Sequence, residues 1–267
     1  MKIAVTGISG KMGRVIGSLV IKDTIAELSS GLTRASSGLE GLDLGEFLGF
    51  EKNNISITSN IDEFVESCEA VIDFSSPSLS LEIAEKCAKY KKVLVCGTTG
   101  FSEQEKQKFA KFAEETVIIW SSNMSLGVNL LMNLVQKVAE ILHDDFDVEI
   151  LEMHHNKKID APSGTALSLG SAVAKGRGIE LEKSAIMARV GKEQKRNKGE
   201  IGFATLRGGD VIGDHTVIFA GEGERIELSH KASSRDIFAK GAIRACIWGS
   251  AQKAGFYSIR DVLDWVG

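Results

Sequence analysis

The sequence predicts an α/β protein of two domains, a doubly wound parallel sheet followed by an α+β domain. Through the first 124 residues, short β-branched runs alternate with helical patterns, as in a parallel sheet wrapped by helices. Strand-like runs in the last third of the chain follow one another without helices between them, which implies a mixed or antiparallel sheet. At 267 residues, the chain is long enough to bury two cores.

The composition is that of an ordinary globular protein. Hydrophobic residues make up 43% of the chain and charged residues 25%, and the formal net charge of -4 argues against nucleic acid as a partner. No apolar run approaches membrane-spanning length, and the apolar start Met1–Val5 is too short for a signal peptide. We therefore expect a cytoplasmic protein with no membrane partner. The cysteines are far apart and are expected to be small core residues: Cys68, Cys87, Cys96 and Cys246.

In the first domain, strands and helices are expected in strict alternation. The predicted strands are Lys2–Thr6, Ala26–Thr33, Ile55–Thr58, Ala70–Phe74, Val93–Cys96 and Val117–Trp120. The predicted helices are Met12–Ile21, Ile61–Ser67, Leu79–Lys89 and Glu103–Glu115. This alternation predicts a Rossmann-like sheet, which binds ligands at the carboxyl ends of its strands.

In the second domain, the pattern changes to a long amphipathic helix from Gly127 to near Asp144. The elements expected after it are a strand Phe146–Met153, a helix from Ser163, strands Ala185–Val190, Gly202–Arg207, His215–Ala220 and Arg225–Lys231, and a helix Asp236–Ala254. The apolar tail ending at Trp265 and Val266 is expected to dock on the first domain. The charge run Gly191–Gly199 predicts a mobile, solvated loop.

The first predicted strand is followed by the glycine turn Gly7-Ile8-Ser9-Gly10-Lys11-Met12-Gly13. At a strand–turn–helix junction, backbone N–H groups and the helix dipole can bind a pyrophosphate. The spacing departs from G-x-G-x-x-G, because Ile8 stands where the first glycine is expected. A tight turn without a ligand is the alternative. A second glycine turn at Gly97–Gly100 on the same sheet is hard to explain by packing alone, and it favours a dinucleotide.

The second predicted strand ends in Thr33 and Arg34, where the adenosine ribose is usually recognised. An acidic residue at this point would bind the ribose 2′-hydroxyl, and this chain has none there. A guanidinium suits bidentate contact with a phosphate, and the small polar residues 35–38 follow it. These residues predict a site for a 2′-phosphate, the alternative being a solvated surface arginine.

The stretch from His154 to Thr165 contains two histidines and two lysines within five residues. These side chains supply proton donors and cations for an acidic substrate. Side chains alternate along a strand, so we expect the preceding strand to end near Met153 and both histidines to follow it. A metal site is not expected, because no carboxylate or thiol stands at ligand spacing on a helix. A polar surface loop is the other alternative.

The end of this stretch, Ser163-Gly164-Thr165 after Pro162, predicts a helix N-terminus. Its free N–H groups would hold a carboxylate of the substrate.

The stretch resembles the H-H-x-x-K-x-D-A-P-S-G-T-A signature of the 4-hydroxy-tetrahydrodipicolinate reductases (dihydrodipicolinate reductases) of bacterial lysine and diaminopimelate synthesis. The resemblance covers nearly the whole chain. It includes Gly7–Gly13, Asp73-Phe74-Ser75, Gly97–Gly100, Ser122–Ser125, Arg207–Asp210, Gly213-Asp214-His215 and His230–Arg235.

The resemblance implies an oxidoreductase that uses NADPH or NADH to reduce the cyclic product of dihydrodipicolinate synthase, after loss of its 4-hydroxyl, to tetrahydrodipicolinate. It makes His154 the catalytic acid/base and Lys158 a proton donor. The substrate contacts it implies are His155, Ser163, Gly164, Thr165 and Arg235. The cofactor contacts expected from the turns and from the resemblance are Gly7, Ile8, Ser9, Gly10, Lys11, Met12, Thr33, Arg34, Phe74, Gly97, Thr98, Thr99, Ser121, Ser122, Asn123 and Met124.

Many members of the family carry an acidic residue where this chain has Thr33, so this chain is expected to accept NADPH. The family is typically a homotetramer built through the sheet of the second domain. We expect a dinucleotide-binding domain at 1–125, a substrate-binding and oligomerisation domain at 126–234, and helices at 235–267 that return to the first domain. The rival interpretations are another two-domain NAD(P) oxidoreductase, such as one acting on sugars, and a nicotinamide-sensing regulator.

Overall fold

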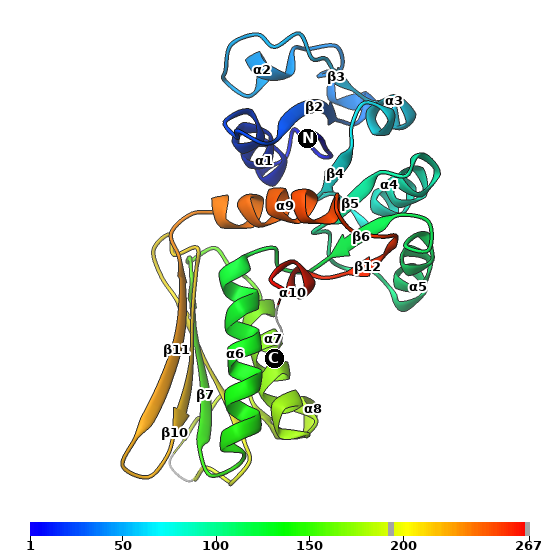
Figure 1. The fold of residues 1–267 in the computed structure, drawn as a ribbon. Helices are drawn as coiled ribbons and strands as arrows, with labels where there is room; N and C mark the ends of the chain where they lie inside the picture. The colour runs from blue at the N-terminus through cyan, green and yellow to red at the C-terminus, as the bar shows by residue number, and fades with distance from the viewer. Residues whose placement is uncertain (192–194, 265–267) are drawn as a thin grey trace. The chain divides into compact units, whose positions relative to one another are not determined.

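The computed structural model describes residues 1–191 and 195–264, and these divide into two compact units (Figure 1). The first unit contains residues 1–126 and takes up the chain again from Arg235, and the second contains residues 127–234. Each unit has its own sheet and its own hydrophobic core.

The sheet of the first unit is parallel throughout, in the order β12-β6-β5-β4-β1-β2-β3. Its strands are β1 (Lys2–Val5), β2 (Glu27–Leu32), β3 (Ile57–Thr58), β4 (Ala70–Asp73), β5 (Val93–Cys96), β6 (Val117–Trp120) and β12 (Gly255–Tyr257). This is the doubly wound order with one strand added at the edge. The predicted Rossmann-like fold is confirmed. The strand order reverses between β1 and β4, where ligands bind in such sheets.

Helices cover both faces of this sheet. They are α1 (Lys11–Ile21), α2 (Leu44–Phe47), α3 (Ile61–Glu66), α4 (Pro77–Tyr90), α5 (Glu103–Phe112), α9 (Asp236–Gly249) and α10 (Ile259–Val262). One core cluster packs α1 and α9 against the strands, and the other packs α3, α4 and α5. Pro77 lies in the first turn of α4, where a missing N–H costs nothing, so this helix begins earlier than predicted.

The segment after residue 234 belongs to the first unit. Helix α9 contributes fully buried residues to its core, including Ala242 and Cys246. Strand β12 then pairs with β6 and forms the edge of the sheet. It was not predicted, because no pattern can be read from a run of three residues. The expected docking of Trp265 and Val266 lies outside the described residues.

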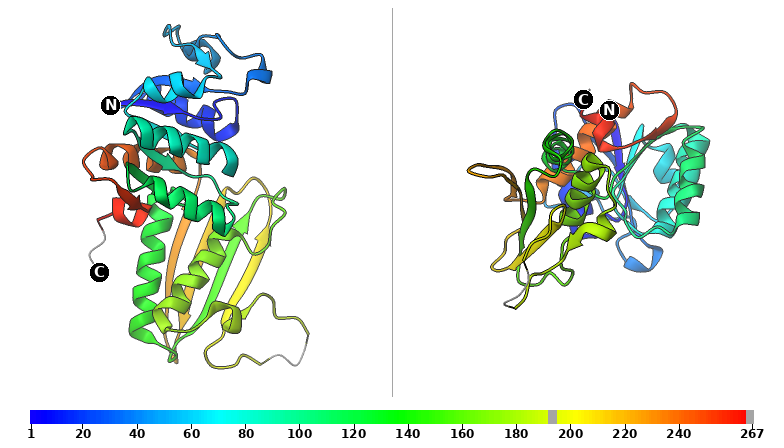
Figure 2. Two further views of the ribbon diagram at one scale, coloured as in Figure 1. Left: turned by 90° about the vertical axis from the view of Figure 1, so that its right-hand side faces the viewer. Right: turned by 90° about the horizontal axis from the view of Figure 1, so that it is seen from below.

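The second unit is a mixed sheet in the order β11-β10-β7-β9-β8, as predicted. The β10 pairings with β7 and β11 are antiparallel, and those of β9 with β7 and β8 are parallel. The elements are α6 (Leu126–Leu142), β7 (Asp147–His154), α7 (Gly164–Arg177), α8 (Leu181–Ser184), β8 (Ala185–Ile186), β9 (Ile201–Arg207), β10 (Gly213–Ala220) and β11 (Arg225–Ala232). Helices α6 and α7 lie on one face of this sheet (Figures 1 and 2), and within the described part of the unit no helix covers the other.

Two local predictions for this unit are wrong. Strand β7 runs one residue past Met153, so His154 does not follow the strand but belongs to it, because every second residue from Val148 to His154 faces the core and is buried. The charge run Gly191–Gly199 is not simply a solvated loop. Residues 192–194 lie outside the description, but the Arg196 guanidinium forms an ion pair with Glu149 and donates to the Val148 carbonyl at 3.0 Å. No helix among residues 1–191 and 195–264 is both long and apolar enough to cross a bilayer.

Candidate functional site

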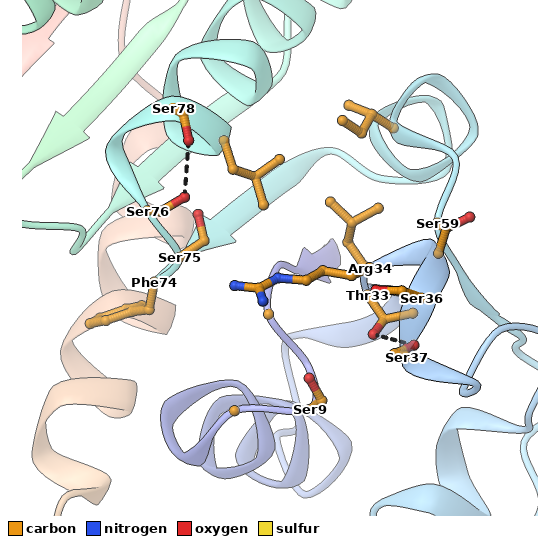
Figure 3. A pocket seen from close by; sticks show the side chains of 16 residues that line it. Ser9, Thr33, Arg34, Ser36, Ser37, Ser59, Phe74, Ser75, Ser76 and Ser78 are labelled. Atoms are coloured by element: carbon orange, nitrogen blue, oxygen red, sulfur yellow. Dashed lines mark hydrogen bonds between the residues drawn. The ribbon is translucent and has the colours of Figure 1, made fainter.

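The first unit carries a pocket of about 860 Å³ at the carboxyl ends of β1, β2 and β4 (Figure 3). Its lining comes from the glycine turn, from the turn after β2 with its short 3-10 helix Ala35–Ser37, and from the start of α4. The predicted cofactor residues that line it are Gly7, Ser9, Gly10, Thr33, Arg34 and Phe74. It lies where the strand order reverses.

The glycine turn has the backbone that close approach of a phosphate requires. Gly7 has φ +58°, a left-handed conformation that favours glycine. A Cβ on Gly13 would stand 2.2 Å from the Gly7 carbonyl oxygen, so only glycine fits there. The N-cap of α1 is Gly10, which has no side chain to satisfy the first N–H groups of the helix. The turn is therefore suited to an anion.

Ile8 explains why the motif departs from the usual spacing. Its side chain is fully buried in the core, and Gly7 supplies the left-handed residue of the turn one position earlier. A contact of Ile8 with a cofactor can only be made through its backbone. Met124 is buried in the same way, and Lys11, Met12, Gly97–Thr99 and Ser121–Asn123 are not in the pocket lining.

Arg34 is the only cation among the described residues that line the pocket, and none of them is acidic. Figure 3 shows its guanidinium extending from the turn after β2 across the pocket, toward the glycine turn. Thr33 donates to the Ser37 hydroxyl at 3.0 Å and so fixes the turn that carries Arg34. The lining is thus selective for negative charge.

A buried aspartate ties the strand ends beside the pocket together. Asp73, with no exposed surface, accepts hydrogen bonds from the Thr6, Ser75, Ser80, Cys96 and Thr98 side chains. The Thr98 hydroxyl also accepts from the Ser75 N–H at 2.9 Å. Sequence reasoning did not single out Asp73 as a site residue, although a carboxylate ending an apolar strand was visible.

Phe74, the next residue, packs its ring on Gly97. A Cβ at Gly97 would stand 2.3 Å from that ring, so the glycine of the second turn allows the aromatic side chain to lie there. Through Asp73 and Phe74, the end of β4 thus contacts Gly97 and Thr98 of the second glycine turn and Thr6, which precedes the first.

In the second unit, a polar cluster lies on the inner face of the mixed sheet. The Glu152 carboxylate is completely buried and lies 2.6 Å from Nδ1 of His154, the next inward-facing residue of β7. From β9, Arg207 donates to both carboxylate oxygens, at 2.8 and 2.9 Å. The Ser163 N–H donates to the same carboxylate at 3.0 Å.

Helix α7 begins at this cluster. Ser163 is its N-cap and accepts from the Ala166 N–H at 3.1 Å, while its hydroxyl shares a hydrogen bond of 3.0 Å with Nε2 of His215. The Ser163 side chain, predicted to contact substrate, is thus buried and holds the start of the helix. Gly164 is exposed, with open space where a side chain would lie, and Thr165 follows it. The N-terminus of α7 is therefore open to an anion.

The pKa values of three groups in the cluster depart from their ordinary values. Burial lowers the pKa of His154, and Lys158 and Arg207 add to this, while the hydrogen bond and charge of Glu152 act in the opposite direction. Burial opposes ionisation of Glu152, but the hydrogen bonds from Arg207, His154 and Ser163 outweigh it and hold its pKa below the ordinary value. Burial, reinforced by His154, lowers the pKa of His215 to about 4. Glu152 is thus ionised and His215 neutral at neutral pH.

The remaining predicted residues surround this cluster or belong to the other unit. Lys158 forms an ion pair with Asp160 at 2.8 Å. His155 has left the strand and is partly exposed. Arg235 is exposed and is the first residue of the segment that returns to the first unit.

Sequence reasoning missed Glu152, Arg207 and His215 as site residues. The signal that the sequence offers is the alternation Glu152-x-His154, which is visible only when the strand continues through His154. Within the described ranges, no group of three histidine, cysteine or acidic side chains is arranged to hold a metal ion.

Comparison with protein families matches both units. The model described as "Dihydrodipicolinate reductase, N-terminus" matches residues 1–124, and the one described as "Dihydrodipicolinate reductase, C-terminus" matches residues 127–263.

Curated relatives match over nearly the full length. A 4-hydroxy-tetrahydrodipicolinate reductase of Roseobacter denitrificans is 45% identical, covering 98% of this chain and 97% of the relative. One of Bartonella tribocorum is 48% identical, with 98% of each covered. Among solved structures, a dipicolinate-bound dihydrodipicolinate reductase from Paenisporosarcina sp. TG-14 matches with a TM-score of 0.76, 25% identity and 97% of each chain covered.

Proposed function

The chain belongs to the dihydrodipicolinate reductase family, and on that premise we propose how its two units divide the family's reaction. The chain is an oxidoreductase of the diaminopimelate and lysine pathway, and it reduces 4-hydroxy-tetrahydrodipicolinate, by way of dihydrodipicolinate, to tetrahydrodipicolinate with a nicotinamide cofactor. In our proposal, residues 1–125 with the returning segment hold the cofactor, and residues 126–234 hold the substrate.

The pocket of the first unit fits the adenosine and pyrophosphate part of a dinucleotide. The support is its volume, its position at the switch point and the uncapped N-terminus of α1. Gly7, Ser9 and Gly10 would hold the pyrophosphate, and Arg34 a 2′-phosphate. The cofactor supplies the hydride when bound. NADPH is the donor that the cationic, acid-free lining favours, and NADH is the alternative.

The cluster of the second unit would bind and protonate the substrate. Hydride arriving at a carbon conjugated to an imine raises electron density on the neighbouring ring atoms, which a proton must neutralise. His154 holds that proton at Nε2, and Lys158 supplies positive charge and a second proton source. The N-terminus of α7 at Gly164 and Thr165 would bind one carboxylate, with His155 and Arg235 as further contacts.

One observation carries this assignment of roles: a buried, ionised carboxylate holds His154 beside the open start of α7. The test couples the purified protein to dihydrodipicolinate synthase and follows the oxidation of the reduced nicotinamide. We expect consumption that depends on the synthase, its substrates and this protein. Consumption no faster than a reaction without the protein would contradict the function.

We further propose a homotetramer in the cytoplasm. The support for assembly is the sheet face of the second unit that its own helices leave uncovered, together with the long edge strand β11, which exposes much of its length. Leu206 and Ile226, at 47% and 38% exposure, are apolar residues of this sheet without full cover. The four cysteines are free and buried, as suits a reducing compartment.

A further inference from the structure

Glu152 is a buried carboxylate with an unusual number of partners for one side chain. We propose that it is the positioning residue of the site: it fixes the His154 tautomer so that Nε2 exchanges the proton, and it holds the start of α7 in place relative to that ring. The proposal rests on the function given above.

Both oxygens of the carboxylate are fully engaged. Oε2 lies 2.6 Å from Nδ1 of His154 and accepts from Arg207 at 2.8 Å. Oε1 accepts from Arg207 at 2.9 Å, from the Ser163 N–H at 3.0 Å and from the Thr205 hydroxyl at 3.3 Å. With no exposed surface and partners on three elements, the carboxylate has one orientation.

The tautomer follows from this arrangement. An ionised carboxylate has no proton to donate, so Nδ1 of His154 must be the donor in the 2.6 Å contact. The second ring nitrogen, Nε2, then carries the lone pair in the neutral ring and the mobile proton in the charged ring. Nε2 lies beside Gly213, where a Cβ would stand only 2.9 Å away. Glycine at this position of β10 leaves that nitrogen unobstructed from this side.

The same carboxylate determines where α7 begins. Oε1 holds the backbone of Ser163, and the Ser163 hydroxyl caps the helix by accepting from Ala166. The proposed carboxylate-binding residues Gly164 and Thr165 come directly after. A single side chain therefore sets both the proton donor and the anion-binding helix start, which must be in register for one substrate.

A purely structural role, as the partner of Arg207 in a buried ion pair, is the competing explanation. The charges around His154 distinguish the structural role of Glu152 from the positioning role. Its neighbours are Glu152 on its own strand, Arg207 from β9, Lys158 from the following loop, and His215 from β10 with ring centroids 5.1 Å apart. Among the described residues, Glu152 is the neighbour that favours a protonated His154, so neutralising it must lower the pKa of that ring. Loosened packing alone has no such direction.

The experiment measures kcat against pH for the wild-type protein, Glu152→Gln and Glu149→Gln. Glu149 is the matched control, because it is an ion-paired carboxylate on the same strand that faces away from the cluster. Turnover of the wild type should fall as pH rises through the pKa of His154. In Glu152→Gln this limb should move to lower pH by about 1 unit or more, with kcat above the limb reduced about tenfold. In Glu149→Gln the limb should stay in place.

Three outcomes separate the ideas. A folded Glu152→Gln protein whose limb does not move overturns the positioning role, while an inactive wild type instead contradicts the function. If Glu152→Gln does not fold, ¹⁵N-histidine NMR of the wild type decides, with the His154 resonances identified by their absence in His154→Gln. The neutral ring should be protonated at Nδ1, and protonation at Nε2 would overturn the proposal.

Discussion

Replacing Arg34 by alanine tests whether the pocket recognises a 2′-phosphate. Among the described residues, the lining has one guanidinium and no carboxylate. A charge-assisted hydrogen bond contributes roughly 1.5–3 kcal/mol, and because Arg34 is exposed we discount this to about 1–2 kcal/mol. NADPH binding should therefore weaken about 5- to 30-fold, with little change for NADH, which has no phosphate there.

The assay is a binding titration of each dinucleotide against both proteins at two ionic strengths. The loss for NADPH should shrink at high salt, because an exposed charge pair is screened. Lys22→Ala serves as the control, since it removes the same charge from the same unit at a residue outside the lining. Equal losses for NADPH and NADH in Arg34→Ala, or an equal effect of Lys22→Ala, would refute the reasoning.

Three other predictions address the proton donor, the buried histidine and the glycine turn. His154→Gln should lower kcat at least about 100-fold with cofactor affinity unchanged, and steady-state kinetics with unaltered turnover would contradict its role. The pKa of His215 is about 4 in the folded protein, so the unfolded chain binds the extra proton as pH falls from about 6.5 to 4. Stability should drop over that window by on the order of 2–3 kcal/mol, and urea unfolding of His215→Gln should show a flatter dependence. Gly13→Ala should lower Tm and abolish cofactor binding, because the added Cβ would stand 2.2 Å from the Gly7 carbonyl oxygen. Gly10→Ala should have a smaller effect, because its Cβ would stand 3.1 Å from the same oxygen. Equal Tm values for the two variants would be evidence against this packing.

The fold was predictable because its signals are local and repeated. Each strand of the parallel sheet is a short buried run, and each is followed by a turn and an amphipathic helix, so one error does not change the topology. Elements without a pattern of their own were missed, namely β12 and the short helices α2, α8 and α10. They form because neighbouring elements offer an edge or a surface, which a single sequence does not display.

The residues of the pocket's turns were predictable, but the buried residue that holds the neighbouring strand ends together was not. Gly7 and Arg34 lie next to strand ends, where chain position alone implies a ligand. Asp73 differs, because its importance comes from five donors that lie in three separate stretches of the chain. No spacing in the sequence predicts that these donors bind one carboxylate.

The cluster of the second unit shows how one misplaced boundary hides a residue. Alternation along a strand correctly predicts that His154 and His155 do not share one face. A strand that ends before both histidines, however, gives no reason to pair His154 with the residue two positions before it. With β7 extended by one residue, the same rule puts Glu152 and His154 on the inner face and releases His155 into the loop. Glu152 thus follows from a rule already in use, whereas Arg207 and His215 require the register of β9 and β10 against β7, which only the folded chain supplies.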